Sequence, residues 1–234
     1  MQDSFQLSLY RQIIFAIPVF VSVIVLRKLW IYRPNPKMLK AGWKAAAAII
    51  IIIILNAIRC FAAPIEVDGI TFLMFAIQVF LVGYCEEVLF RGLLFNAFHK
   101  KFGVRSLAGT RLAVVLSGII FGATHLLNAT NPSVSFTSAV IQAGSAAFMG
   151  IFLGAVYIRC GRGLWYVVFL HALNDAVAFI ASGRLGGNSA AEIVNTIGIQ
   201  AGFAQVVFAA VLFGGLSIFV LRKKKLEPCL AKLS

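Results

Sequence analysis

Seven stretches of the chain are apolar over the length that a helix needs to cross a bilayer, about 20 residues for a hydrocarbon core of about 30 Å. They cover residues 11–30, 43–62, 70–98, 111–128, 134–158, 163–181 and 199–221. Only 12% of the residues are charged, against about 25% in soluble domains, so these stretches are solvated by lipid. The sequence therefore predicts an all-α, polytopic transmembrane helix bundle of about seven spans, with residues 1–234 forming a single integral-membrane domain.

Lysine and arginine gather on one side of the predicted bundle. Of the 21 basic residues, six lie between the first and second spans, four between the third and fourth, two between the fifth and sixth, and five after the seventh. Because short cytoplasmic loops are enriched in these residues, the N-terminus is expected outside and the C-terminus in the cytoplasm of a prokaryotic plasma membrane. The net charge of +13 is thereby assigned to topology and to contact with membrane lipids, and no nucleic-acid partner is expected.

Three acids and two histidines lie inside predicted spans, where hydrocarbon excludes charge. They are Glu86, Glu87, Asp175, His125 and His171. An ionised group at membrane depth costs at least ~2.5–3.5 kcal/mol, so each of these residues needs a partner or a function. Counted at ~1.5 Å per residue from the cytoplasmic end of each helix, Glu86, His125 and His171 lie at depths of about 20, 21 and 12 Å. These overlapping depths predict one site, which includes Asp175 because it lies one helical turn from His171.

Helical spacing separates the roles of the two adjacent glutamates. Glu87 and Arg91 are four residues apart, so they lie on one face of the helix and can form an ion pair. This pair is interpreted as a structural brace. Glu86 is rotated from Glu87 by about 100° around the helix axis, so its carboxylate lacks the arginine partner and is free to face a cavity.

Three short motifs carry these residues in order along the chain. They read Glu86-Glu87-Val88-Leu89-Phe90-Arg91, Phe121-Gly122-Ala123-Thr124-His125 and His171-Ala172-Leu173-Asn174-Asp175. Together, each on its own predicted span, they resemble the CPBP family of intramembrane proteases, also called the CAAX protease and bacteriocin-processing, or Abi, family. The resemblance covers about residues 70–181 and implies that these four spans form a catalytic core.

The resemblance implies an intramembrane endopeptidase that hydrolyses a peptide bond of a membrane-associated peptide or of a prenylated protein. In such an enzyme Glu86 would activate a water molecule that His125 and His171 hold. The other motif residues that the resemblance assigns to the site are Asp175, which orients the cluster, the brace formed by Glu87 and Arg91, and the accessory residues Phe121 and Asn174.

The sequence leaves substrate specificity and metal dependence open. The prenyl-protein branch of the family has asparagine at the last motif position, where this chain has Asp175 preceded by Asn174, so prenyl-protein specificity does not follow. Glu86, His125 and His171 form a donor set that a catalytic zinc ion can use, but the compact His-Glu-x-x-His motif is absent. Both a zinc-dependent metalloprotease and a metal-free glutamate mechanism fit these residues.

Two functions other than proteolysis also place ionisable residues at mid-membrane. A non-catalytic membrane immunity or binding protein would use such a cavity without turnover. A proton-coupled transporter would use the carboxylates and histidines as a relay, although the sequence shows no inverted repeat and no pair of spans broken by glycine or proline. The sequence defines neither the oligomeric state nor the organism nor the identity of the substrate.

Overall fold

The computed structural model describes residues 2–33, 35–61, 68–103, 106–181 and 198–233. These residues form helices almost throughout, and no strand occurs among them. Seven helices in this part of the chain are long and apolar enough to cross a membrane: Gln6–Val25, Pro36–Ile58, Gly69–Phe102, Leu107–Thr130, Phe136–Arg159, Leu164–Ala181 and Ile199–Val220. The predicted all-α membrane bundle of about seven spans is therefore confirmed, with limits that differ from the predicted ones by several residues.

Four of the spans consist of two or three helical elements joined end to end. The elements are α1 (Gln2–Val25), η1 (Leu29–Tyr32), η2 (Pro36–Met38), α2 (Leu39–Phe61), α3 (Gly69–Glu87), η3 (Val88–Phe95), α4 (Asn96–Phe102), α5 (Leu107–Thr124), η4 (His125–Thr130), α6 (Phe136–Arg159), α7 (Leu164–Ala181), α9 (Ile199–Ala209), η5 (Ala210–Gly214), α10 (Gly215–Val220) and α11 (Lys223–Leu233). The elements η3 and η5 are π-helical. They continue the helices before them, so α3, η3 and α4 form one long span, as do α9, η5 and α10.

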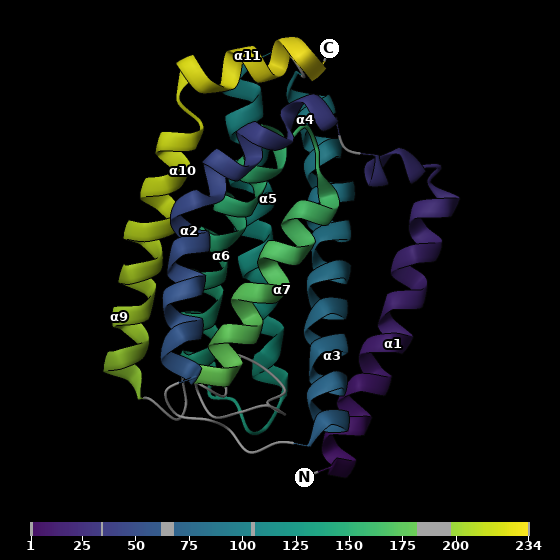
Figure 1. Ribbon diagram of the computed structural model, residues 1–234, viewed down its shortest axis with the longest axis vertical. Coiled ribbons are helices and arrows are strands. Elements are labelled where there is room, and N and C mark those ends of the chain that lie inside the picture. The colour runs from purple at the N-terminus through teal and green to yellow at the C-terminus, as the bar shows by residue number, and fades with distance from the viewer. Residues whose placement is uncertain (1, 34, 62–67, 104–105, 182–197, 234) are drawn as a thin grey trace.

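Helix α6 lies at the centre of the bundle and packs against α5, α2, α7 and α9 (Figure 1). Helix α1 packs chiefly against α3 and diverges from the other helices toward one end of the bundle. At that end α11 lies across the helices and contacts α5 and α6. We call it the α11 end, and the opposite end, where the N-terminus lies, the N-terminal end.

Helices α5 and α6 approach each other closely because α5 carries glycines at the contact. A Cβ atom added to Gly118 would lie 2.6 Å from the backbone nitrogen of Ile151, and one added to Gly122 would lie 2.5 Å from the carbonyl oxygen of Ala143. Neither backbone atom can move aside as a flexible side chain would. Such small-residue contacts are a common way to bring membrane helices together, and here they fix the end of α5 that leads to His125.

The facing surface of α6 also carries small residues. Ala146, Gly150 and Gly154 recur at every fourth position, a spacing typical of close packing between membrane helices. In the structure Gly150 lies against Phe121 and Gly154 against Val114, both on α5. Ala146 instead forms part of a cavity wall. On α6, residues of the seam therefore alternate with residues of the cavity wall, because Ala143 and Ala147 contact Gly122 while Ala146 lines the cavity.

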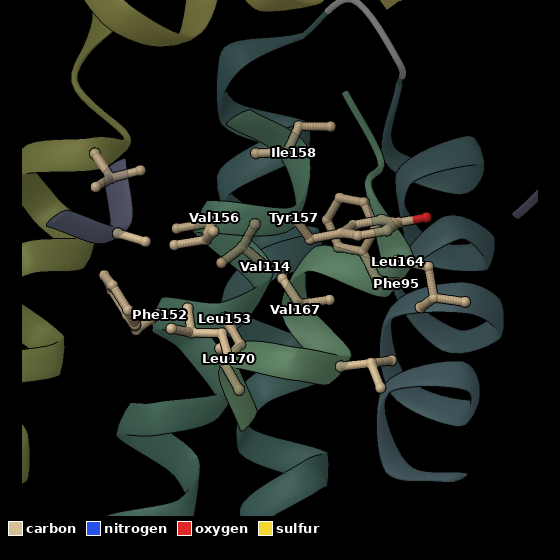
Figure 2. Close-up of a cluster of buried hydrophobic side chains, with 14 of the residues drawn as sticks. Phe95, Val114, Phe152, Leu153, Val156, Tyr157, Ile158, Leu164, Val167 and Leu170 are labelled. Carbon is tan, nitrogen blue, oxygen red and sulfur yellow. The ribbon is translucent and has the colours of Figure 1, made fainter. Parts of the chain in front are cut away.

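The largest cluster of buried apolar side chains fills the half of the bundle nearer to the α11 end (Figure 2). Its members are at most 8% exposed and include Phe95, Val114, Phe152, Leu153, Val156, Tyr157, Ile158, Leu164, Val167 and Leu170. On α6 this cluster occupies 152–158, and on α7 it occupies 164–170. Because lipid is as apolar as these side chains, their close packing and not their removal from water holds the helices together. This tightly packed half holds in place the helices that carry the motif residues.

Candidate functional site

A cavity of about 520 Å³ occupies the half of the bundle nearer to the N-terminal end. Its walls come from α1, α2, α3, α5, α6, α7 and α9 together with η4 and η5. Six of the residues singled out from the sequence line it: Glu86, Phe121, His125, His171, Asn174 and Asp175. The structure thus brings residues of all three motifs to one cavity, while Glu87 and Arg91 lie behind its wall.

The two adjacent glutamates have different surroundings, although both lie in the last turn of α3. The Glu87 side chain is 0% exposed, whereas the Glu86 side chain is 27% exposed and lines the cavity. Glu87 Oε1 lies 2.8 Å from Arg91 Nη1, which is the ion pair that the spacing predicts. Glu86 therefore presents a carboxylate to the cavity, and Glu87 presents one to the interior of the protein.

Arg91 lies on the π-helix η3 and links three helices from a fully buried position. Besides its contact with Glu87, its Nη2 donates a hydrogen bond to the carbonyl oxygen of Gly150 on α6 (2.9 Å). Its guanidinium group lies 4.8 Å from the centre of the Phe121 ring on α5, within the range of a cation–π contact. These contacts support the interpretation of Arg91 as a structural residue.

His171 stands at the centre of the site, surrounded by three carboxylates. Its Nδ1 lies 2.8 Å from Glu87 Oε1. Its Nε2 lies 3.3 Å from Asp175 Oδ2 and 3.5 Å from Glu86 Oε2. With Nδ1–H donated to the buried Glu87, the ring orientation is fixed and Nε2 is directed to the two carboxylates that line the cavity.

The contact between Glu87 and His171 is not predicted from the sequence. Helical spacing assigns Glu87 to Arg91 alone, but in the structure the same oxygen, Oε1, contacts both residues. Glu87 therefore has two roles: it pairs with Arg91, and it also positions His171. No local pattern reveals this contact, since the two residues are 84 positions apart and meet only when α3 packs against α7.

His125 is the first residue of η4, directly after the end of α5. Its Nδ1 lies 2.9 Å from the carbonyl oxygen of Phe121, so this nitrogen is the donor and Nε2 remains for other groups. The Phe121 ring packs edge-on against both His125 and His171, with ring centres 4.9 and 5.9 Å apart. Phe121 thereby separates the two imidazoles, and both interact electrostatically with Glu86.

Asp175 and Asn174 differ in what they contact, although both line the cavity. Asp175 Oδ2 approaches His171 Nε2, as the spacing of four residues predicts. Asn174 Nδ2 lies 3.6 Å from Met149 Sδ on α6 and 3.5 Å from Asp175 Oδ1. Asp175 is therefore the partner of His171, while Asn174 connects α7 to α6.

The donor set was also compared with the requirements of a metal site. Among the described residues, no three His, Cys, Asp or Glu side chains are arranged to hold a metal ion. The Nδ1 atoms of His125 and His171 already contact Phe121 and Glu87, and His171 Nε2 faces Asp175. A histidine that binds zinc through Nε2 usually donates Nδ1–H to a carbonyl or a carboxylate, so these contacts suit a zinc-bound and a zinc-free site alike. The zinc expectation stays a prediction, and the chemistry proposed below uses side chains and water.

Amide side chains line much of the remaining cavity wall. They are Gln12, Asn56, Gln78, Asn128, Gln142 and Gln205, in addition to Asn174. These six residues lie outside the three motifs found in the sequence. The signal that identifies the carboxylates and histidines would also have found them, because amides are polar groups that hydrocarbon excludes.

A comparison with protein-family models shows which proteins this chain is related to. Residues 68–177 match the family described as type II CAAX prenyl endopeptidase, Rce1-like. The predicted resemblance to the CPBP family is therefore confirmed over residues 68–177. Comparisons with curated proteins and with solved structures give no match.

The region that matches the CPBP family carries every residue of the cluster around His171. It begins at the residue before α3 and ends within α7. Helices α1, α2 and α9 lie outside it, and they supply part of the cavity wall. The match to this family, together with the seven long apolar helices of the described residues, fits an integral membrane protein related to CAAX-type proteases in the broad sense.

Proposed function

We propose that this protein is an intramembrane endopeptidase in which Glu86 is the general base. The proposal rests on the different surroundings of the two adjacent glutamates. Glu87 is fully buried and contacts Arg91 and His171, whereas Glu86 is partly exposed to the cavity and lies 3.5 Å from His171 Nε2. One carboxylate is thus used to build the site, and the other is available to a water molecule and a substrate.

In the proposed reaction a water molecule lies between Glu86 and the scissile carbonyl carbon. Glu86 takes a proton from this water as its oxygen bonds to the carbonyl carbon, which forms a tetrahedral oxyanion. His125 and His171 donate Nδ1–H to Phe121 and Glu87, so they stabilise that oxyanion through Nε2–H in their doubly protonated, imidazolium forms. When the C–N bond breaks, Glu86 returns the proton to the leaving nitrogen, so the products are a carboxylic acid and an amine. Asp175 contacts His171 Nε2 and keeps this edge of the imidazole toward the cavity.

The substrate class proposed for this site is a membrane-associated peptide or a lipidated protein. A cavity that several transmembrane helices enclose suits a chain that reaches the site from within the bilayer. The family match supports a CAAX-type protease in the broad sense.

The decisive variant is Glu86→Gln, which preserves the shape of the side chain and removes its basicity. We expect a folded protein whose cleavage rate is lower by at least ~10²-fold, the lower range for loss of a general base. Purified protein in detergent is incubated with a peptide library, and cleavage products are identified by mass spectrometry. Glu227→Gln is the matched control, because its side chain is 51% exposed on α11, far from the cavity.

Two results would contradict the proposal. Cleavage by folded Glu86→Gln at the rate of the Glu227→Gln control would show that Glu86 is not the base. Failure of the wild-type protein to cleave any peptide, combined with a biological protection that Glu86→Gln retains, would favour the non-catalytic immunity role instead.

A further inference from the structure

The amide side chains of the cavity form a group of their own, which the proposed reaction does not use. The chain contains 15 Asn and Gln residues, and seven of them line this cavity. Each of the seven comes from a different element: α1, α2, α3, η4, α6, α7 and α9. Because hydrocarbon excludes amides, a random distribution over seven helices would not bring half of them to one wall. We call these residues the cavity amides.

Most cavity amides lie between the Glu86 level and the N-terminal end of the bundle. Gln78 precedes Glu86 by eight residues on α3, which is about 12 Å along the helix. Gln142 precedes Gly150, the partner of Arg91, by the same number of residues on α6 and is therefore displaced by a similar distance of about 12 Å. The ionisable residues of the wall thus lie at one level, and the cavity amides extend from that level along the cavity.

Several polar atoms in this region lack some or all of the hydrogen-bond partners that they could have. Among the described residues, Gln78 Oε1 and Ser145 Oγ are buried without a hydrogen bond, and Ser145 also lines the cavity. Asn128 Nδ2 donates to Gln142 Oε1 (2.6 Å), which leaves the Gln142 amide NH₂ as a donor for another group. A buried polar atom without a partner is costly to a protein, so these atoms indicate where a polar ligand binds.

The chemistry of an amide matches that of a peptide backbone. An Asn or Gln side chain offers both N–H donors and a C=O acceptor, and an extended peptide offers the same two groups in alternation. A bilayer contains no water to satisfy the backbone of a chain that is not helical. Any segment that is unwound for cleavage therefore needs donors and acceptors from the protein, and the cavity amides are suited to supply them.

The scarcity of charged residues beyond the Glu86 level limits the kinds of ligand that this part of the cavity can bind. Among the described wall residues, the ionisable side chains are Glu86, His125, His171 and Asp175, and the rest of the wall consists of amides, hydroxyls and apolar groups. Beside the cavity amides other than Asn174, which contacts Asp175, a charged side chain of a substrate would meet no acidic wall residue. An uncharged segment would meet both hydrogen-bonding and apolar surface.

We propose that the cavity amides bind the backbone of an extended, uncharged peptide segment next to the scissile bond. This inference rests on the proposed proteolytic function and assigns the substrate's backbone, not its side chains or a lipid, as the group that is recognised. Gln142 is the central contact, because it is buried at 9% exposure and still has donors to offer. Gln205 provides a second contact from α9, a helix that lies outside the residues matched by the family.

The test measures binding separately from cleavage. The full-length Glu86→Gln protein is purified, and its affinity for a dansyl-labelled alanine–leucine hexapeptide amide is measured by fluorescence. The same hexapeptide with N-methyl groups at alternate residues, which removes half of the backbone donors, is the second probe. Gln142→Met and Gln205→Met are each made in the Glu86→Gln background. Gln200→Met is the matched control, because Gln200 lies on α9 but does not line the cavity.

We expect Gln142→Met and Gln205→Met each to weaken binding of the unmodified hexapeptide by about tenfold, the effect of one or two hydrogen bonds. The N-methylated hexapeptide should bind weakly to all proteins, and Gln200→Met should leave both affinities unchanged. Equal affinity for the two hexapeptides, or affinities of both folded glutamine variants within twofold of the control, would overturn the inference. A protein that binds as expected but whose wild-type form cleaves nothing would refute the proposed function and leave backbone binding established.

Discussion

Replacement of Glu87 by glutamine removes the one carboxylate that contacts both Arg91 and His171. The side chains of Glu87 and Arg91 are 0% and 1% exposed. Loss of one partner from a buried ion pair costs about 3–5 kcal/mol, because the other charge stays buried without compensation. Arg91 keeps its hydrogen bond to Gly150 and its position over Phe121. We therefore expect the free energy of unfolding to fall by about 3 kcal/mol, the lower end of that range.

A double-mutant cycle separates the ion pair from the other contacts of its two members. Arg91→Met leaves the Glu87 carboxylate with His171 as its only ionic partner among the described residues. The double variant, Glu87→Gln with Arg91→Met, contains neither buried charge. Its destabilisation should be smaller than the sum of the two single effects by about 2–3 kcal/mol, near the upper limit for residues in direct contact. Unfolding by SDS in mixed micelles, followed by tryptophan fluorescence, measures all four stabilities.

Activity distinguishes the two single variants, because only Glu87 contacts His171. Per folded molecule, Glu87→Gln should cleave more slowly by up to about 10²-fold, since misplacement of a catalytic group by 1 Å can have that effect. Arg91→Met should keep its specific activity within about tenfold, despite its lower stability. Stability losses that simply add in the double variant would refute the ion-pair reasoning. Equal specific activities of the two single variants would refute the positioning role of Glu87.

Two further predictions concern the topology and the helix seam. In a cysteine-free background, a cysteine introduced at Gln2 should react with an impermeant maleimide added outside the cell, and one at Lys232 only after the cytoplasmic side is opened, because the basic loops are expected to be cytoplasmic; the reverse pattern would contradict that orientation. Gly122→Ala should destabilise the protein by about 1–3 kcal/mol through overpacking, since its Cβ would lie 2.5 Å from a backbone oxygen of α6. Gly215→Ala is its control, as no atom lies within 4 Å of an added Cβ there, and equal thermal stability of the two variants would show that the seam is not tightly constrained.

The features that short-range periodicity controls are the ones that the sequence analysis predicts correctly. Apolar length defines the seven spans. Spacing of four residues on one helix predicts the contact of Glu87 with Arg91 and that of His171 with Asp175, and both are present. These predictions succeed because the geometry of a single helix fixes them without reference to any other helix.

Contacts between helices are not predictable in this way, because they depend on where each helix begins and how it is displaced along its neighbour. The depth count places Glu86 and His171 about 8 Å apart, yet their side chains lie 3.5 Å from each other. A depth counted along the helix axis leaves out the reach of the two side chains, and it depends on the end of each span, which for the third span lies at Phe102 because this span continues through η3 and α4. The π-helical geometry of η3 also has no periodic signature in the sequence, as π-helices are rare and short.

The division of the bundle into a packed half and a hollow half has a consequence for how this protein can diverge. On α6 and α7 the residues of the packed half occupy one continuous stretch and those of the cavity wall another. Helices α1, α2 and α9, which complete the wall, lie outside the matched family region. Substitutions that reshape the wall can therefore accumulate without loosening the core or moving the Glu86 cluster. On α6 and α7, stability and selectivity are encoded at separate positions of the same helix, so related proteins can differ in substrate while they share one scaffold.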